Sequence, residues 1–507
     1  MGASRAADDP GGTLMDSKRT GILLLVCLFL SLVGCTEDSP SPPASDSETK
    51  GETTSDGEMA TGSGDGMVSD SQEDAGLVVP PWGDGLVHPF SPQEAELKRT
   101  GNVIELDLVA SQQVHKTPYG DVPGYAYNEV TPGPTIRGRV GDELRVSLTN
   151  GLLTPTTIHW HGAHVPWDMD GVVWKMDPVS PGETFLYTFP LTQAGTFWYH
   201  PHFDTDSQVD LGLYGMLVVE EEEEAPVDHE LLLVFDSFEE VKHQETTEHT
   251  HVHGGTIVTT WLVNGALAPE VEFPAGSRVR VRMVNSSNGG YLDLRWPGMR
   301  MVGGDQGRFG GVRTPDSLVL VPGERAEVEW RVGSEEFSLQ NQPHTLMGGE
   351  SYGEPYSMLT VVPVGDAPLP EWGDWGSPET EVTPDPDYTD IHYVFTGSPR
   401  TGQWLINGEE YPDVTVEEVP AGESRIIEIR NLSPSHHPFH MHGVSFEVLS
   451  VNGVAPAEKR IEDTMNVGIY EVVRIMATNN NPGEWMVHCH ILGHAHNGMM
   501  TVIHFLP

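Results

Sequence analysis

Cysteine is nearly absent from this sequence, which has three in 507 residues. Cys27 and Cys35 lie within and at the end of one apolar run near the N-terminus, whereas Cys489 stands alone near the other end of the chain. Cysteines placed in this way cannot form a disulfide framework. We expect Cys489 to be the only thiol in the folded part of the protein.

Positive charge is also scarce. Lys and Arg number 27 against 75 Asp and Glu, and the formal net charge is -48 at pH 7. Phosphate binding needs clustered Lys and Arg, so we expect no nucleic-acid partner. A small neutral or cationic substrate is compatible with this charge.

Long apolar runs are limited to residues 21–33, which follow two positively charged residues. This run is too short to span a bilayer comfortably and is typical of a signal peptide. It ends in LVGC (32–35), which resembles a bacterial lipobox and implies cleavage before Cys35 with a lipid on its sulfur. An ordinary cleaved signal and a signal anchor are the alternatives, and Met15 is an alternative start of the chain.

The N-terminal part therefore predicts export. We assign residues 1–35 to a signal peptide with a lipobox and expect a lipid-anchored protein in the bacterial cell envelope, in the periplasm or the outer membrane. Contact with the membrane is expected only through the lipid on Cys35. Residues 36 to about 76 are mostly Ser, Gly, Thr, Asp and Glu with almost nothing to bury, which predicts a disordered acidic tether. We assign residues 36–84 to this disordered acidic linker.

Helical periodicity is scarce in the remaining chain, which has short β-rich runs between Gly and Pro residues. Three stretches repeat a glycine turn, an alternating strand and a final asparagine: VGDELRVSLTN (140–150), PAGSRVRVRMVN (274–285) and PAGESRIIEIRN (420–431). The final asparagines are 135 and 146 residues apart, which fits repeated β-sandwich domains. We predict an all-β protein with domains at 85–225, 226–368 and 385–507 and a linker at 369–384.

Histidine pairs recur at equivalent points of the first and third repeats. Nine residues after the final asparagine come HWH in the first repeat, LRW in the second and HMH in the third. Near the end of the same two domains, GTFWYHPH and GEWMVHCH place a second pair five and seven residues after a glycine. The four pairs are His159 and His161, His200 and His202, His440 and His442, and His488 and His490.

Both members of such a pair point to the same side of a strand, because a strand alternates its faces. A single pair is more often a surface accident or a satisfied core pair than a ligand set. Four pairs at repeat-equivalent positions predict eight imidazoles around one interface between two domains. Burying them without partners is costly, and metal ions supply partners.

The third repeat adds further candidate ligands: His437, Cys489, His494 and Met499. Two histidines, one cysteine thiolate and a weak axial methionine form the ligand set of a blue-copper electron-transfer site. At the same offsets the first repeat has Thr156, Pro201, Asp206 and Leu211. The blue-copper set is therefore predicted in the last domain alone.

The motifs HWHG, HPH, HPFHMHG and HCHILGHAHNGM closely resemble those of the multicopper oxidase family, in its bacterial laccase-like form, and the resemblance extends from about residue 85 to the end. It implies three tandem cupredoxin-like Greek-key β-sandwich domains, the second without copper ligands, and four copper ions. The implied ligands are His437, Cys489, His494 and Met499 for the blue, type 1 copper and His159 and His440 for the type 2 copper. For the two type 3 coppers they are His161, His200 and His490 on one ion and His202, His442 and His488 on the other.

The resemblance also implies the reaction. A reductant gives electrons singly to the type 1 copper, and O₂ is reduced to water at the other three. The expected partners are O₂ and a small reducing substrate, a phenol or aromatic amine as for laccases, and the protein is expected to be a monomer. The alternatives are a metallo-oxidase of Cu(I), Mn(II) or Fe(II), which the lack of a dense methionine-rich insert weakens, and a copper-free cupredoxin scaffold, which the complete ligand set disfavours.

Proton supply rests on fewer residues. In relatives, an acidic residue downstream of the first histidine pair relays protons, and Asp170 in WDMDG falls at that offset. It is the predicted catalytic residue, and a plain turn residue is the alternative. Many bacterial relatives carry Glu directly after the last blue-copper histidine, where this chain has Ala495, which leaves His496 or water as substitutes.

One histidine-rich stretch lies apart from these motifs. HTHVH (His249, His251 and His253) falls in a predicted loop of the second repeat. It is either a labile copper site or a solvated polar hairpin.

Overall fold

The computed structural model describes residues 86–117, 120–221, 227–242, 256–344, 355–365, 371–377 and 379–507. The predicted signal peptide, Cys35, the acidic linker and the HTHVH stretch lie outside these residues. Cys489 is the one cysteine in the ranges described, and it is buried and free. Within the same ranges, no helix is long and apolar enough to cross a membrane.

The first segment contains ten strands and two short helices. These are β1 (Leu86–Val87), β2 (Lys98–Thr100), β3 (Val103–Thr117), β4 (Gly120–Tyr127), β5 (Gly133–Arg139), β6 (Glu143–Asn150), β7 (His159–His161), the 3-10 helix η1 (Trp167–Met169), β8 (Thr184–Pro190), β9 (Gly195–His200), α1 (Thr205–Asp210) and β10 (Gly215–Glu220). The second segment contains β11 (His229–Lys242), β12 (Thr256–Val263), β13 (Glu270–Pro274), β14 (Arg278–Asn285), β15 (Leu292–Arg295), β16 (Arg300–Gly304), β17 (Gly307–Arg313), β18 (Leu318–Leu320), β19 (Arg325–Arg331), β20 (Phe337–Gln342) and β21 (Tyr356–Val364).

The last segment contains eleven further strands and one helix. These are β22 (Ile391–Ser398), β23 (Gln403–Ile406), β24 (Glu417–Val419), β25 (Ser424–Asn431), β26 (His437–Met441), β27 (Phe446–Val451), β28 (Ile461–Glu462), β29 (Thr464–Val467), β30 (Val472–Thr478), β31 (Gly483–Cys489), α2 (Leu492–His496) and β32 (Met500–Phe505).

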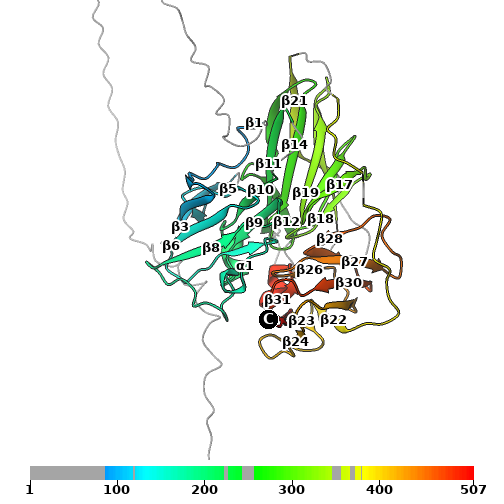
Figure 1. Ribbon diagram of the computed structural model, residues 1–507. Coiled ribbons are helices and arrows are strands. Elements are labelled where there is room, and N and C mark those ends of the chain that lie inside the picture. Colours follow the sequence, from blue (N-terminus) through cyan, green and yellow to red (C-terminus); the bar gives the residue numbers. More distant parts are fainter. Residues whose placement is uncertain are drawn as a thin grey trace, which may run out of the picture. The chain divides into compact units, whose positions relative to one another are not determined.

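The strands form sheets that come in three pairs (Figure 1). The orders are β2-β3-β6-β8 and β5-β10-β9-β7 in the first pair, β1-β11-β14-β19-β16-β17 and β13-β21-β20-β15-β18 in the second, and β23-β22-β25-β30-β27-β28 and β24-β32-β31-β26-β29 in the third. In one sheet of each pair, an equivalent parallel step (β3 with β6, β11 with β14, β22 with β25) precedes antiparallel strands, and the other sheet of each pair has a parallel step of its own (β5 with β10, β13 with β21, β24 with β32), so the three repeats share one topology. Each pair encloses an apolar core, and the predicted all-β fold is confirmed.

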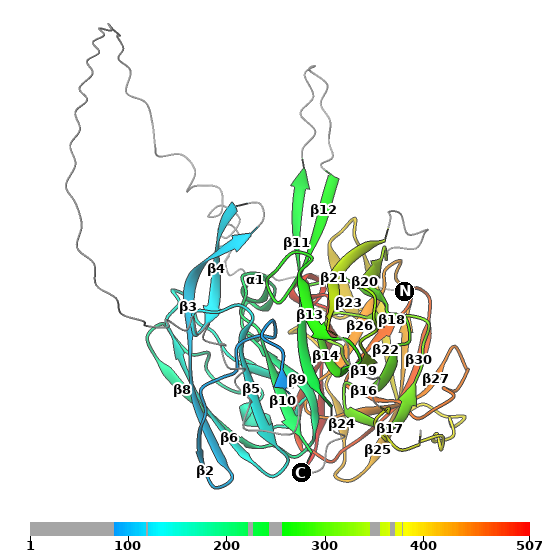
Figure 2. The ribbon, with the colours of Figure 1, turned by 90° about the horizontal axis from the view of Figure 1, so that it is seen from above.

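One strand crosses the predicted domain limits. β1 pairs in parallel with β11, so Leu86 and Val87 extend a sheet of the second pair. Figure 2 shows the β11–β12 and β3–β4 hairpins, which project from the sheets of the second and first pairs. The boundaries 85–225, 226–368 and 385–507 stay predictions.

A buried asparagine ends the repeated strand in each segment and fixes the loop that follows. Asn150, Asn285 and Asn431 are fully buried. In each, the side-chain oxygen accepts the backbone N–H two residues on. The side-chain amide donates to a carbonyl four or five residues on and to another 29 to 36 residues on. This local amide turn brings the next segment to an equivalent place, which is a His-x-His strand in the first and last repeats.

Candidate metal centre

Two antiparallel strand pairs bring the predicted histidine pairs together. In the first segment β7 pairs with β9, so that His159 lies opposite His200. In the last segment β26 pairs with β31, and His440 lies opposite His488. The first and last segments contact each other through these histidines, because the imidazole of His442 stacks on that of His159 with 3.8 Å between the ring centroids. The eight buried histidines of this cluster are His159, His161, His200, His202, His440, His442, His488 and His490.

Strand pleating separates these histidines from the residues between them. Trp160, between the first pair, lies in the core of the first sandwich, and Met441 and Cys489 lie in the core of the last. The opposite strand faces carry the histidines to the interface. Cys489 is therefore held in the last sandwich, although it is covalently flanked by two histidines of the cluster.

Most rings of the cluster have one buried nitrogen without a partner. These atoms are Nε2 of His159, His200, His202 and His440, Nδ1 of His161, and both nitrogens of His490. Nε2 of His442 and Nε2 of His488 face each other at 3.1 Å. Each unsatisfied buried polar atom costs about 1–3 kcal/mol, so the arrangement is unfavourable unless these nitrogens bind something.

In His200, His440 and His488, one ring nitrogen is held by a backbone carbonyl. Nδ1 of His200 and Nδ1 of His488 each donate to the carbonyl of the next residue at 2.9 Å, and Nδ1 of His440 donates to the carbonyl of Asp463 at 2.9 Å. A carbonyl only accepts, so these nitrogens carry the proton and Nε2 keeps its lone pair. A neutral imidazole held in this way is ready to bind a metal ion.

Burial keeps the imidazoles neutral. It is the main reason that the pKa lies well below its ordinary value in His161, His200, His202, His442 and His490, and it also lowers the pKa of His440. Burial lowers the pKa of His488 to about 3, with the neighbouring His440 as the next cause. No proton therefore competes with a metal ion for these rings near neutral pH.

Asp170 lies against the cluster. It follows η1, is 1% exposed, and accepts from Nδ1 of His159 at 3.1 Å and from Nδ1 of His442 at 2.8 Å. Gly171 makes this approach possible: its φ is +81°, and a Cβ there would lie 2.0 Å from the carbonyl oxygen of Ile158. The carboxylate thus orients one ring from each segment, while its predicted role as a proton relay stays a prediction.

A second buried carboxylate was not predicted. Asp463 accepts from Arg325 through both carboxylate oxygens and lies 3.3 Å from Nε2 of His161. Arg325 also lies 3.2 Å from Asp305, so one cation serves two carboxylates. Burial and the charge of Asp463 raise the pKa of Asp305 well above its ordinary value, whereas Arg325 holds the pKa of Asp463 well below. The middle segment thus supports the cluster through Arg325 and Asp305.

The predicted blue-copper residues also converge. Sγ of Cys489 lies 3.5 Å from Nδ1 of His437 and 3.6 Å from Nδ1 of His494, and the two nitrogens are 3.2 Å apart. Donors about 2.0–2.3 Å from a central ion in a trigonal arrangement lie roughly 3.5–4 Å apart. Met499 is fully buried beside them, and its carbonyl accepts the N–H of Cys489 at 3.2 Å.

Access to this site is asymmetric. His437 is fully buried, while His494, in α2, is half-buried. The indole of Trp404 covers the ring of His494, with 3.9 Å between centroids. Solvent therefore approaches this site at His494.

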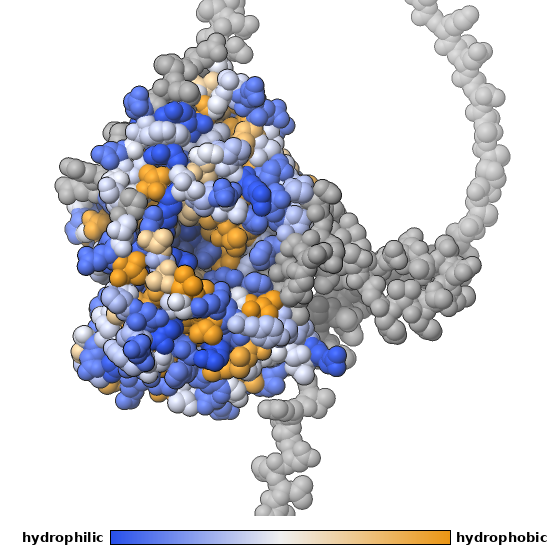
Figure 3. Space-filling model, turned by 90° about the vertical axis from the view of Figure 1, so that its right-hand side faces the viewer, coloured by the Kyte–Doolittle hydropathy of each residue, from blue (hydrophilic) through white to orange (hydrophobic). Residues whose placement is uncertain are grey.

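Figure 3 shows one face of the protein, where hydrophobic residues gather in small groups among hydrophilic ones.

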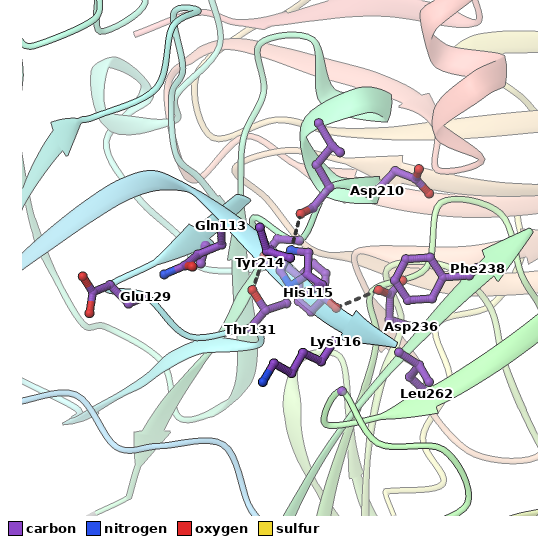
Figure 4. A pocket seen from close by; sticks show the side chains of 15 residues that line it. Gln113, His115, Lys116, Glu129, Thr131, Asp210, Tyr214, Asp236, Phe238 and Leu262 are labelled. Carbon is purple, nitrogen blue, oxygen red and sulfur yellow. Dashed lines mark hydrogen bonds between the residues drawn. The ribbon is translucent and has the colours of Figure 1, made fainter. Parts of the chain in front are cut away.

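A separate cavity of about 190 Å³ lies between the β3–β4 and β11–β12 hairpins (Figure 4). Its lining includes His115, Lys116, Tyr214 and Asp236, and no predicted copper ligand. Tyr214 donates to Asp236 at 2.7 Å, and burial raises the pKa of Asp236 to about 7. This cavity is therefore separate from the predicted copper ligands.

Comparison with known proteins places the chain among copper enzymes. Two family models, each described as multicopper oxidase, match residues 109–224 and 383–505. The multicopper oxidase MmcO of Mycobacterium tuberculosis is 27% identical, with 83% of this chain and 91% of that protein covered. Laccase-1 of Fomitopsis schrenkii is 26% identical, with 83% and 89% covered.

Solved structures agree in fold. The crystal structure of a multi-copper oxidase from Pseudomonas thermotolerans is 31% identical, with a TM-score of 0.68 and 80% of this chain and 99% of that chain covered. A multicopper oxidase from Campylobacter jejuni, described as a metallo-oxidase, is 25% identical, with a TM-score of 0.68 and 84% and 96% covered. The sandwiches of this chain are therefore cupredoxin-like, as predicted.

Proposed function

The chain belongs to the multicopper oxidase family, and on this premise we propose that it oxidises phenols or aromatic amines one electron at a time and reduces O₂ to water. It is a copper-dependent oxidoreductase. The observation that carries the proposal is the cluster of buried histidine nitrogens that lack partners. In His200 and His440 a backbone carbonyl holds the opposite nitrogen, so the lone pair of Nε2 is free to bind a metal ion. When bound, copper supplies one-electron chemistry and a binding place for O₂.

The proposed type 1 ligands are His437, Cys489, His494 and Met499, and the convergence of the first three within 3.6 Å supports them. The proposed type 2 ligands are His159 and His440. The proposed type 3 ligands are His202, His442 and His488 on one ion, which can share one metal in the observed geometry, and His161, His200 and His490 on the other.

The protein's own part is to guide electrons and exclude water. A reductant reaches the half-buried edge of His494, and Cys489 is the next group inward. His488 and His490 flank Cys489 along β31, so the backbone supplies a short covalent path from the type 1 site to the cluster. Burial of the cluster histidines keeps bulk water away from them.

The test uses the copper-loaded protein. We expect a blue protein with four coppers that takes up O₂ in the presence of a phenol, and Cys489→Ser is expected to lose both the colour and the turnover. A colourless copper-loaded protein would show that the assignment is wrong. Rates with a phenol, Cu(I), Mn(II) and Fe(II) on one sample decide between the laccase reaction and the metallo-oxidase alternative.

We also propose that the protein is exported and anchored to the cell envelope by a lipid on Cys35, as a monomer. The apolar run and LVGC motif support this proposal. Metabolic labelling with a radioactive fatty acid tests it: label is expected in the wild type and absent in Cys35→Ser. Sedimentation of a soluble chain that starts after Cys35 tests the monomer.

A further inference from the structure

The histidine cluster meets solvent at one ring. His202 is 9% exposed, whereas the other seven histidines are 0 or 1% exposed. A cavity of about 180 Å³ lies at this point, and His202 and His488 line it. A cavity of this size holds several water molecules. Its lining also includes the exposed residues Asp204 and His496, so it connects the cluster to the surface.

Asp206 places a carboxylate in the same cavity. It lies in α1, its side chain is 26% exposed, and its Oδ1 lies 3.2 Å from Nδ1 of His496 in α2. Asn288 joins the two helices, because its side-chain amide donates to the carbonyl of Asp206 at 2.7 Å and its backbone carbonyl accepts the N–H of Leu492 at 2.8 Å. The position of Asp206 over the cavity is therefore fixed by three parts of the chain.

The neighbouring residues Ala495 and Asp204 do not supply an equivalent carboxylate to the cavity. Ala495 lines the wall with a methyl group. Asp204 lines the cavity too, but it is exposed and its carboxylate accepts from Ser207 at 3.2 Å. The titratable lining residues are His202, Asp204, Asp206, Tyr411, His488 and His496.

Asp170, the carboxylate predicted from the sequence, is differently placed. It is 1% exposed, and its two oxygens accept ring N–H groups from His159 and His442. A carboxylate in that position is suited to orienting rings. A carboxylate that exchanges protons with solvent must reach solvent, as Asp206 does.

We propose that Asp206 passes protons from solvent through this cavity to the side of the cluster formed by His202 and His488. The proposal rests on the proposed function, in which one O₂, four electrons from the reductant and four protons give two water molecules. For each of the four protons, the Asp206 carboxylate takes a proton from water at the surface and gives it to water in the cavity. It is a carboxylate again at the end, so the residue is neither oxidised nor consumed.

The test compares Asp206→Asn with Asp204→Asn, which removes the same charge at an exposed lining position two residues nearer to His202 along the chain. Enzyme reduced under argon is mixed with O₂, and reoxidation is followed as a function of pH. We expect about a tenfold or larger loss of rate in Asp206→Asn, within the range of proton-transfer contributions, a changed pH profile, and normal kinetics in Asp204→Asn. Adding Ala495→Glu to Asp206→Asn is expected to restore the rate, because it returns a carboxylate to the cavity.

Two further measurements separate proton transfer from a structural role. Copper content and blue absorption are expected to be unchanged in Asp206→Asn. In enzyme labelled with ¹³C at the aspartate carboxyl groups, infrared difference spectra between reduced and reoxidised states are expected to show a deuterium-sensitive carboxyl band. This band should be present in Asp204→Asn and absent in Asp206→Asn.

Ala495→Leu provides a second variant, because it fills the cavity without altering Asp206. If Asp206→Asn fails to load copper, Ala495→Leu tests the proposal instead. Slow reoxidation of Ala495→Leu supports proton transfer through the cavity, and normal reoxidation overturns the proposal. Wild-type kinetics in fully loaded Asp206→Asn overturn the proposal as well. A wild type that is colourless or does not consume O₂ instead refutes the proposed function, before any variant is measured.

Discussion

The indole of Trp404 stacks on the imidazole of His494, with ring centroids 3.9 Å apart and 29° between the planes. The same indole forms a T-shaped contact with the ring of His437, with 5.3 Å between the centroids. Trp404 is 5% exposed, so it is a packing residue of the last sandwich that reaches both histidines of the proposed type 1 site. It fixes their spacing before any metal binds.

Trp404→Ala is therefore expected to weaken binding of the blue copper. Groups that orient metal ligands typically contribute 10–100-fold to affinity, so we expect a loss of about tenfold. Blue absorption measured against added copper gives the affinity. Trp404→Phe keeps an aromatic face and should lie near the wild type; identical titrations for the alanine variant and the wild type would refute this role.

Asp170→Asn should affect the other coppers. The amide keeps one acceptor oxygen, but its NH₂ group faces an imidazole N–H, so His159 or His442 loses its side-chain acceptor. Nδ1 of His159 keeps the backbone carbonyl of Asp170 as a partner, so the loss is larger when the NH₂ group faces His442. We expect slower O₂ reduction and about 10–100-fold weaker binding at the cluster, with the blue absorption intact. Copper counting and paramagnetic resonance measure this.

Asp168→Asn is the matched control, because Asp168 lies exposed on the same short helix η1. Four coppers per chain and normal reoxidation in Asp170→Asn would contradict both the orienting role and the predicted relay.

Arg325→Met should destabilise the fold. It leaves Asp463 and Asp305 buried without their shared cation, and removing one partner of a buried ion pair costs about 3–5 kcal/mol. Denaturant unfolding of the copper-loaded protein measures the free energy of unfolding. Arg295→Met, an exposed arginine on β15, is expected to change it little. Equal stability of the two variants would show that Arg325 is not a structural requirement.

Asp236 should make stability depend on pH. Burial raises its pKa in the folded protein to about 7, against 3.8 for an ordinary aspartate. The folded state thus holds a proton that the unfolded state has lost, and the free energy of unfolding falls as pH rises from about 4 to about 7. The fall is at most about 4 kcal/mol, since one pKa unit is worth about 1.4 kcal/mol.

Asp236→Asn removes this dependence and should be the more stable protein above pH 7. Asp107→Asn, an exposed aspartate on β3, serves as the control and should keep the wild-type slope. If the free energy of unfolding of Asp236→Asn depends on pH as in the wild type, the titrating group is not Asp236.

The sequence predicted the parts of this protein that repeat. Alternation and the terminal asparagine identified the strands, and equal offsets from Asn150 and Asn431 identified histidines that the fold does bring together. Asp463, Arg325 and Asp305 were missed because they act across segments and repeat nowhere. Burial and shared charge define their role, and neither is visible in spacing.

The proposed role of Asp206 could not be predicted from the sequence either. Its offset matched that of His494, so the sequence marked it only as a position where a blue-copper ligand is lacking. Its place over the cavity depends on the contact between α1 and α2 and on Asn288 from the middle segment. Long-range packing of this kind has no local signature. The copper assignment of each histidine also stays a prediction.

The distribution of the ligands along the chain sets an order of assembly. The proposed type 1 set lies within residues 437–499 and is complete once the last sandwich has formed. The cluster needs β7 and β9 from the first segment to dock on β26 and β31, which closes a loop through the whole middle segment and carries an entropic cost. A chain that is still maturing, or is short of copper, is therefore expected to turn blue before it can reduce O₂.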